Sequence, residues 1–429
     1  MRRWTALTLA FAVLAGAGST HGYPVDGSPH TGITRLEAYS LAKAFLLETG
    51  TLPPGAFLSM NDVQLSLRQR PDFRLPDSDP ELVSEIRALL GADVAAYGIA
   101  VLDLSDPNAL RYAELNGSQA MNVGSVGKIL VALAWFQTLA DLYPDVTDRE
   151  RLLKNTQLVA NDFIRKDSHV VPVWKPGDPK VVRRPIAEGD RVNLWTWFDW
   201  MMSASSNAAA SMLMSELLLL RHFGSEYPVS PQRAAAFFRE TPQAELSKQL
   251  EQAMFEPVRR NGLNSGQFRQ GSFFTREGKA RVPGGKSWAT PRQLLQYMLL
   301  IEQGRLVDAW SSLEIKRLLY LTDGRIRYAS SPALHDSAVY YKSGSLYSCK
   351  EESGYECGKY MGNRWNYLSS VATVETPNDA TPLRYIVVVM SNVLKKNSAE
   401  VHQSLGTRLH RLMEAANSPT TSPADAPSH

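Results

Sequence analysis

Ser125 and Lys128 are residues whose types and spacing could perform nucleophilic catalysis. Residues three positions apart lie on the same face of a helix, so the Lys128 amine can reach the Ser125 hydroxyl if a helix begins here. The positive end of a helix dipole would also stabilise negative charge that develops at Ser125. A free lysine titrates near about 10.4, so Lys128 can serve as a base only if burial or another cation lowers its pKa. The pair predicts a serine nucleophile activated by a lysine.

The second pattern, Ser205-Ser206-Asn207, stands at the start of another predicted helix. A hydroxyl and a carboxamide two positions apart could relay a proton and hold a substrate amide. Ser and Asn are also frequent helix N-caps, so a purely structural role is the alternative interpretation.

The third pattern, Lys342-Ser343-Gly344, lies inside a predicted strand. A lysine here could supply positive charge to the Ser125–Lys128 pair and to a substrate carboxylate. Glycine would let the backbone of a ligand approach the strand edge closely. The alternative is a lysine that faces solvent on a strand ended by a turn.

None of these patterns is specific by itself, because two of them recur elsewhere in the chain. Ser40-Leu41-Ala42-Lys43 repeats the first inside an amphipathic helix, and Ser59-Met60-Asn61 repeats the second. The order of the three patterns and their structural setting distinguish the copies that begin at Ser125, Ser205 and Lys342 from the others. Only this combination places the first pattern at a helix start after strands, the second in a helical middle region and the third on a late strand.

The elements that must position these residues are strands at both ends of the chain and helices between them. Strand-like runs are Ala95–Leu104, Leu110–Leu115, Val339–Leu346, Tyr367–Thr376 and Tyr385–Ser391. Helical spacing occurs at Thr34–Leu47, Glu81–Leu90, Val126–Ala140, Leu194–Met202, Asn207–Leu220, Pro231–Arg239, Ala244–Phe255, Pro291–Gln303 and Ala399–Ala415. This order predicts an α+β fold in which an antiparallel sheet, built from the N- and C-terminal parts, carries an inserted helical lobe. A cleft at their junction is the expected place for a site.

The ordered motif set resembles that of the serine β-lactamase and penicillin-binding protein superfamily, and of class A β-lactamases in particular. Asn122-Val123-Gly124-Ser125 is similar to the family's approach to the nucleophile. Thr290-Pro291 is similar to its helix start ahead of the third motif, and Arg384–Val389 to its closing strand before a terminal helix. The resemblance covers Ala95 to Ala415 and implies a β-lactamase/transpeptidase-like fold.

The resemblance also implies a role for each motif residue. Ser125 would attack a carbonyl, Lys128 would help to activate it, and Ser205 would pass a proton to the leaving nitrogen. Asn207 would bind the substrate or Lys128. The third motif, Lys342-Ser343-Gly344, would hold a substrate carboxylate. The backbone N–H groups of Ser125 and Ser345 would form an oxyanion hole. No metal or organic cofactor is implied.

One part of the class A pattern is absent. Class A β-lactamases carry a Glu-x-x-Leu-Asn segment between the second and third motifs, whose Glu activates the hydrolytic water. Here Phe255-Glu256-Pro257 matches that segment only in part, and the alternative is that Glu256 simply ends a helix.

The function that the resemblance implies is an exported serine hydrolase that forms a Ser125 acyl-enzyme with a β-lactam or a D-alanyl-D-alanine-type amide. The alternative is a slowly deacylating D,D-peptidase, or a sensor that binds penicillin or peptidoglycan without turnover.

The flanking segments predict the domain organisation. Residues 1–22 combine Arg2 and Arg3 with an apolar stretch and small residues, which is typical of a signal peptide, although a buried N-terminal helix is the alternative. Residues 23–91 read as a helical extension and 92–416 as the catalytic domain, with the helical lobe at about 126–335. Val146–Asp190 reads as a polar insertion or a long surface excursion, and Gly262–Lys286 reads as a loop. The tail, 417–429, reads as disordered.

Composition limits the partners. A net charge of +3 over 429 residues, with dispersed Lys and Arg, argues against nucleic-acid binding. Cys349 and Cys357 are the only cysteines, and after export they would form a local disulfide; two free thiols or half a metal site are the alternatives. We expect a periplasmic or secreted monomer without a stable membrane anchor, acting on a small β-lactam or a peptidoglycan stem peptide.

Overall fold

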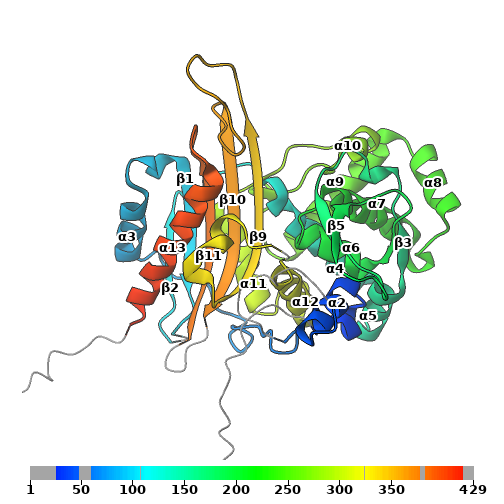
Figure 1. Cartoon of the computed structure of the whole chain (residues 1–429), viewed down its shortest axis with the longest axis horizontal. Coiled ribbons are helices and arrows are strands. Elements are labelled where there is room, and N and C mark those ends of the chain that lie inside the picture. The colour runs from blue at the N-terminus through cyan, green and yellow to red at the C-terminus, as the bar shows by residue number, and fades with distance from the viewer. Residues whose placement is uncertain (1–25, 48–58, 107, 323, 377–381, 419–429) are drawn as a thin grey trace, which may run out of the picture.

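The computed structural model describes residues 26–47, 59–106, 108–322, 324–376 and 382–418. The predicted signal segment, residues 1–22, lies outside the described residues, as does most of the predicted tail. A sheet forms the centre, with helices α3 (Pro80–Leu90) and α13 (Ser398–Ala416) on one side and a helical lobe on the other (Figure 1). The predicted α+β fold with an inserted helical lobe is confirmed.

The central sheet has five antiparallel strands in the order β2-β1-β11-β10-β9. The two ends of the chain meet in it, because Ile99 of β1 pairs with Val389 of β11. Strand β1 is buried along its whole length, since helices cover both faces of the sheet. Strand β9 lies at the edge beside the helical lobe. The strands are β1 (Tyr97–Asp103), β2 (Arg111–Leu115), β9 (Ala338–Ser348), β10 (Trp365–Thr376) and β11 (Leu383–Asn392).

Helix α4 (Lys128–Leu142) is the core of the helical lobe, with Trp135 and Phe136 fully buried. By length and hydropathy the segment Gly124–Leu142 could span a membrane, but 78% of its apolar window is buried inside the protein. Its apolar character is therefore explained by packing. The helices around it are α5 (Val146–Asn155), α6 (Leu194–Met202), α7 (Asn207–Phe223), α8 (Pro231–Glu240), α9 (Gln243–Arg260), α10 (Arg276–Arg281), α11 (Pro291–Glu302) and α12 (Ala309–Tyr320).

The segment Val146–Asp190 differs from the predicted surface excursion. It contains α5 and parts of two small two-stranded sheets, made of β3 (Gln157–Val159) with β6 (Arg191–Asn193), and β4 (Val170–Val173) with β5 (Val182–Pro185). Isolated apolar residues hold it to the lobe: Leu153, Phe163 and Val171 are at most 1% exposed. Single buried apolar residues among charged ones give little helical or strand periodicity, so the sequence pattern indicates a polar surface segment. A further small sheet pairs β7 (Phe268–Arg269) with β8 (Trp288–Ala289).

Helix α12 was not predicted, because two charged residues interrupt its apolar face. Glu314 and Lys316 are both fully buried, and Lys316 Nζ donates to Glu302 Oε2 at 2.8 Å and to Glu375 Oε1 at 2.7 Å. Buried ions paired in this way satisfy one another, so a buried helix can carry charges that suggest a solvent-facing one.

The N-terminal extension packs on the helical lobe through α1 (Ser28–Thr31) and α2 (Thr34–Lys43). The Arg35 guanidinium is 1% exposed and donates to both carboxylate oxygens of Asp199 in α6. The predicted helix Thr34–Leu47 ends at Lys43, and Phe45, which the helical spacing placed on the apolar face, is 96% exposed. A left-handed backbone at Phe45 (φ 59°) accompanies this early end.

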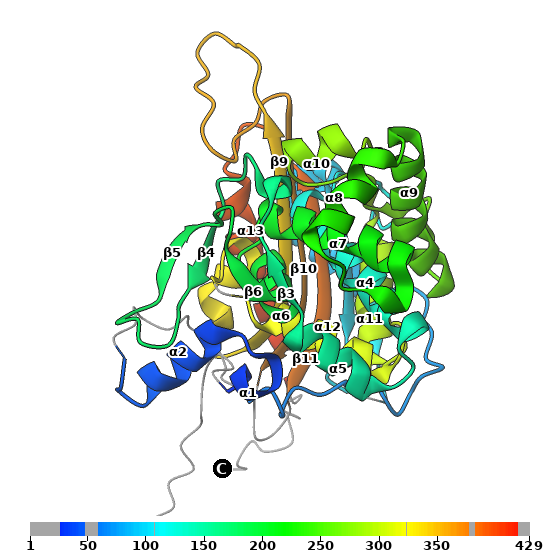
Figure 2. The same ribbon diagram turned by 90° about the vertical axis from the view of Figure 1, so that its right-hand side faces the viewer.

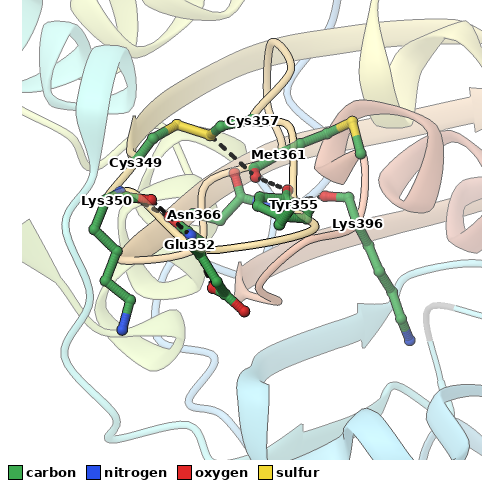
Figure 3. Close-up of a disulfide and its surroundings, with 9 residues drawn as sticks. Cys349, Lys350, Glu352, Tyr355, Cys357, Met361, Asn366 and Lys396 are labelled. Atoms are coloured by element: carbon green, nitrogen blue, oxygen red, sulfur yellow. Dashed lines mark hydrogen bonds between the residues drawn. A yellow bond between two sulfur atoms is a disulfide. The ribbon is translucent and has the colours of Figure 1, made fainter.

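The connection between β9 and β10 projects from the body of the molecule (Figures 1 and 2). Cys349 and Cys357 form the predicted disulfide, and the Cys357 sulfur and the Tyr355 hydroxyl both contact the carbonyl of Met361 (Figure 3). Two alternatives at this pair, free thiols and half a metal site, are thereby excluded. The cross-link holds the connection together at the end of the strand that carries the third motif.

Candidate active site

The first and third motifs meet where a 3₁₀ turn, Gly124–Gly127, abuts the edge strand β9. Gly344 allows this approach, because a Cβ there would lie 2.4 Å from the amide nitrogen of Ser125. Gly124 has a left-handed φ of 50°, and a Cβ there would lie 2.7 Å from the amide nitrogen of Ser345. Glycines at both positions therefore bring the amides of Ser125 and Ser345 to the border of one space.

Ser125 and Lys128 are in direct contact. Ser125 lies in the 3₁₀ turn, Lys128 begins α4, and Lys128 Nζ donates to Ser125 Oγ at 2.8 Å. Lys128 is fully buried and also donates to the carbonyl of Ser205 at 2.7 Å and to Asn207 Oδ1 at 2.8 Å. These three bonds use every N–H of the ammonium. In the second copy of this pattern, by contrast, Ser40 and Lys43 are exposed on α2.

The second motif divides its functions among its three residues. Ser206 is the N-cap of α7 and accepts a hydrogen bond from the Ala209 amide at 3.1 Å. Its neighbours Ser205 and Asn207 both contact Lys128, and Ser205 has a left-handed φ of 58° that is rare for a non-glycine residue. The capping interpretation therefore holds for Ser206, and the catalytic interpretation fits the geometry of the other two.

Lys342 of β9 completes a continuous polar chain. Its Nζ donates to Ser205 Oγ at 2.8 Å, while Lys128 Nζ lies 3.5 Å from the same oxygen. The order of contacts is Ser125 Oγ, Lys128 Nζ, Ser205 Oγ and Lys342 Nζ. All three sequence motifs thus contribute to one cluster, although they are far apart along the chain.

Burial and like charges lower the pKa of both lysines. Burial brings the pKa of Lys128 down to about 7, with Asp167 opposing the shift and the Arg327 charge adding to it. Burial, Lys128 and Arg327 together hold the pKa of Lys342 well below its usual value. At neutral pH a large share of Lys128 is therefore an uncharged amine, the form that can accept a proton from Ser125.

Asp167 supports the second motif from behind, and sequence reasoning missed it because it falls in the segment read as a surface excursion. Its Oδ2 accepts from Ser206 Oγ at 3.0 Å and from the Ala208 amide at 2.8 Å, and its Oδ1 contacts His169 Nδ1 at 2.5 Å. Burial opposes its ionisation, but these partners outweigh burial and lower the pKa of Asp167 to about 2. Asp167 is thus a fixed negative charge at the start of α7.

Arg327 is a second residue that sequence reasoning missed. Its guanidinium donates to Ser343 Oγ and to Ser345 Oγ, each at 2.9 Å, and packs over the ring of Tyr360 from the β9–β10 connection. Its left-handed φ of 57° marks a strained backbone. A lone arginine in an irregular segment carries no sequence signal, so only the fold reveals that Arg327 supports the third motif.

Comparisons with known proteins agree with this geometry. A model of the Beta-lactamase enzyme family matches residues 81–413, well over half of the chain. The chain belongs to this family. The resemblance to the serine β-lactamase and penicillin-binding protein superfamily is therefore confirmed. No curated protein sequence matches the chain significantly.

Solved structures with the same fold include PBP-A and β-lactamases. PBP-A gives a TM-score of 0.50 at 14% identity and covers 80% of this chain and 100% of its own. A PBP-A variant in an acyl-enzyme complex with penicillin G gives the same values. The β-lactamase from Sphaerobacter thermophilus DSM 20745 gives 0.50 at 16% identity, with 78% and 98% covered. At these identities the structures establish a shared fold alone.

The cleft of this family member, about 750 Å³ in volume, contains Ser125 and has no carboxylate among the described residues that line it. The segment Gly262–Lys286, which the sequence predicted to be a loop, instead contains β7 and α10, and together with Ser287 and Trp288 it contributes much of the cleft lining. Gln270 lines the cleft there, is 2% exposed and has a side-chain oxygen without a hydrogen-bond partner. Phe274 from the same segment lies over Lys128, with 4.7 Å between Nζ and the ring centroid.

Glu256 does not line this cleft. It lies on α9, where its carboxylate pairs with Arg221 of α7 at 2.8 Å. The partial echo of the class A segment is therefore a surface ion pair. Nor do the described residues bring three His, Cys, Asp or Glu together as metal ligands would be arranged.

Proposed function

We propose that Ser125 attacks the carbonyl of a β-lactam or of a D-alanyl-D-alanine-type amide and becomes acylated. The observation that carries this proposal is the 2.8 Å contact between Ser125 Oγ and the buried Lys128 amine, whose pKa burial lowers to about 7. The uncharged amine takes the hydroxyl proton as the new C–O bond forms. An exposed lysine at its ordinary pKa would be protonated and could not do this.

The scissile carbon–nitrogen bond breaks when the leaving nitrogen receives a proton. Ser205 Oγ lies between the two lysines, so it can give its proton to that nitrogen and regain one from Lys128. Lys342 keeps the Ser205 hydroxyl in place. The amides of Ser125 and Ser345, which border one space beside Gly124 and Gly344, are suited to stabilise the oxyanion.

The substrate carboxylate would bind at the third motif. The hydroxyls of Ser343 and Ser345 are held by the two arms of the Arg327 guanidinium, and the Lys342 amine lies beside them, with its Nζ 3.2 Å from the carbonyl oxygen of Ser343. Hydroxyl donors backed by a fixed guanidinium favour an anion over a neutral amide. A free carboxylate next to the scissile amide is common to penicillins and to peptides that end in D-alanine.

The acyl-enzyme would hydrolyse slowly, because the described residues that line the cleft include no carboxylate to activate a water. The fold accommodates a serine acylated by penicillin, because a PBP-A variant that shares it was solved as an acyl-enzyme complex with penicillin G, and the described cleft lining of this chain offers no carboxylate that would hydrolyse such an adduct. This favours a D,D-peptidase or a penicillin-binding sensor over an efficient β-lactamase. The N-terminal Arg-Arg and apolar stretch support export to the periplasm or beyond, where such substrates occur.

Labelling with a fluorescent penicillin tests this function. Residues 23–429 are incubated with the probe, alongside Ser125→Ala and the matched control Ser40→Ala, which alters the exposed second copy of the motif. We expect the wild type and Ser40→Ala to carry one label per chain and Ser125→Ala to carry none. Labelling that survives in Ser125→Ala would overturn the nucleophile. Rapid turnover of a chromogenic cephalosporin would overturn slow deacylation.

A further inference from the structure

Besides Ser125, the cleft is lined by residues of the segment Gln270–Trp288 and of strands β9 and β10. Among these lining residues are the aromatic side chains Phe273, Trp288 and Trp365. Leu346, which follows the third motif on β9, is 43% exposed there. Exposed apolar surface inside a concave site is available for contact with a ligand.

The direction of the substrate fixes which part of it meets these lining residues. In a D-alanine amide the carboxylate belongs to the leaving group, so the acyl group lies on the other side of the scissile bond. The carboxylate end is at Ser343 and Arg327, and the carbonyl is at Ser125 and Ser345. The acyl group would therefore extend beyond Ser345 toward Leu346 and the segment Gln270–Trp288.

The charges on the described cleft lining all have one sign. Of the described residues that line the cleft, only Lys279 and Lys286 carry a formal charge. Both are exposed, and neither forms an ion pair with another described residue. On the same helix Glu277 is already paired with Arg281, so it does not neutralise Lys279. Two unpaired lysines beside apolar walls create a positive potential that attracts an anion.

We infer that Lys279 and Lys286 select substrates whose acyl group carries its own carboxylate, in addition to the one on the leaving group. The inference rests on the proposed function of Ser125 and names the substrate class of that site. A stem peptide with a free side-chain carboxylate on the acyl side has this chemistry. The lysines would act as specificity-determining residues and take no part in the bond-breaking steps.

Three penicillins that differ at one side-chain carbon provide the test. Carbenicillin carries a carboxylate there, benzylpenicillin a hydrogen and ampicillin an ammonium group. We expect second-order rates of Ser125 acylation in that order, with roughly a threefold to tenfold difference at each step at low salt. The differences should shrink in about 0.5 M salt, where exposed charges are screened over a few ångströms.

The double variant Lys279→Gln/Lys286→Gln should bring the ratio of the carbenicillin rate to the benzylpenicillin rate close to one. The control Lys396→Gln, at a lysine that pairs with Asp93 on the far side of the sheet, should keep the wild-type ratio. Because each ratio is taken within one protein, partial misfolding does not alter it. An unchanged ratio in the double variant would overturn the inference while leaving acylation intact. Absence of acylation by all three penicillins would overturn the proposed function, and the inference with it.

Discussion

The two walls of the cleft differ in the functional groups that they carry. The wall made by the 3₁₀ turn, the start of α7 and strand β9 holds Ser125, Lys128, Ser205 and Lys342 in one chain of hydrogen bonds. The opposite wall, the segment Gln270–Trp288, contributes an amide, aromatic rings and lysines to the described cleft lining, whereas its Glu277 pairs with Arg281 and does not line the cleft. We propose that the groups of the first wall perform acylation, whereas the described lining of the second wall offers no carboxylate as a base for deacylation.

On this proposal, the groups assigned to acylation lie in or beside elements whose positions follow from the sheet and the core helix α4. A group that activates water would come from the segment Gln270–Trp288, which is irregular on either side of α10 and can change without disturbing those elements.

The largest effect should come from the acylating wall. Lys128→Met keeps a side chain of similar volume but removes the base, so we expect the acylation rate to fall roughly 100- to 10,000-fold. Stopped-flow measurement with a chromogenic cephalosporin reports this rate. Lys43→Met, in the exposed second copy of the motif, is the control and should have no effect. A wild-type rate in Lys128→Met would remove the lysine from the mechanism.

A smaller gain is expected on the opposite wall. Gln270→Glu places a carboxylate of the same shape in the cleft, and we expect deacylation to accelerate about tenfold to a hundredfold because water gains a general base. The release of penicilloate from preformed acyl-enzyme measures this rate. Gln267→Glu, three residues before Gln270 and outside the cleft lining, is the control. If both variants deacylate like the wild type, the missing carboxylate is not what limits turnover.

The pH dependence sharpens the assignment of the base. Burial lowers the pKa of Lys128 to about 7, so the acylation rate should rise about tenfold per pH unit below that value and level off above it. Asp167 raises the pKa of Lys128, so Asp167→Asn should move the inflection to lower pH. Acylation rates of each protein between acid and neutral pH would show this. A shift in the opposite direction would contradict the role given to Asp167.

The sequence predicted the parts of the site that lie in regular elements. Ser125, Ser205 and Lys342 each stand at a helix start or on a strand, so the expected order of elements was enough to bring them together. It could not predict Arg327 or Asp167, because both act from irregular segments and contact the motifs only through the tertiary fold. The same reason applies to Gln270, whose loop has no periodic pattern.

Buried charge explains where the predicted fold was incomplete. Helix α12 was missed because Glu314 and Lys316 occupy its buried face. The segment Val146–Asp190 read as a surface excursion because its apolar anchors are single residues among many charged ones. One partner of Lys316 is Glu375 of β10, and the elements that bury the apolar anchors are also distant along the chain, so local sequence patterns do not reveal them.

The lifetime of the acyl-enzyme tests the contrast between the two walls most directly. The protein is mixed with a small excess of benzylpenicillin, and its intact mass is followed over time, with Ser125→Ala in parallel. Our account predicts a rapid gain of one penicillin mass per chain, confined to Ser125, that persists after the free drug is removed. Rapid consumption of the drug without an accumulated adduct would contradict it, because a cleft without a carboxylate would then deacylate efficiently.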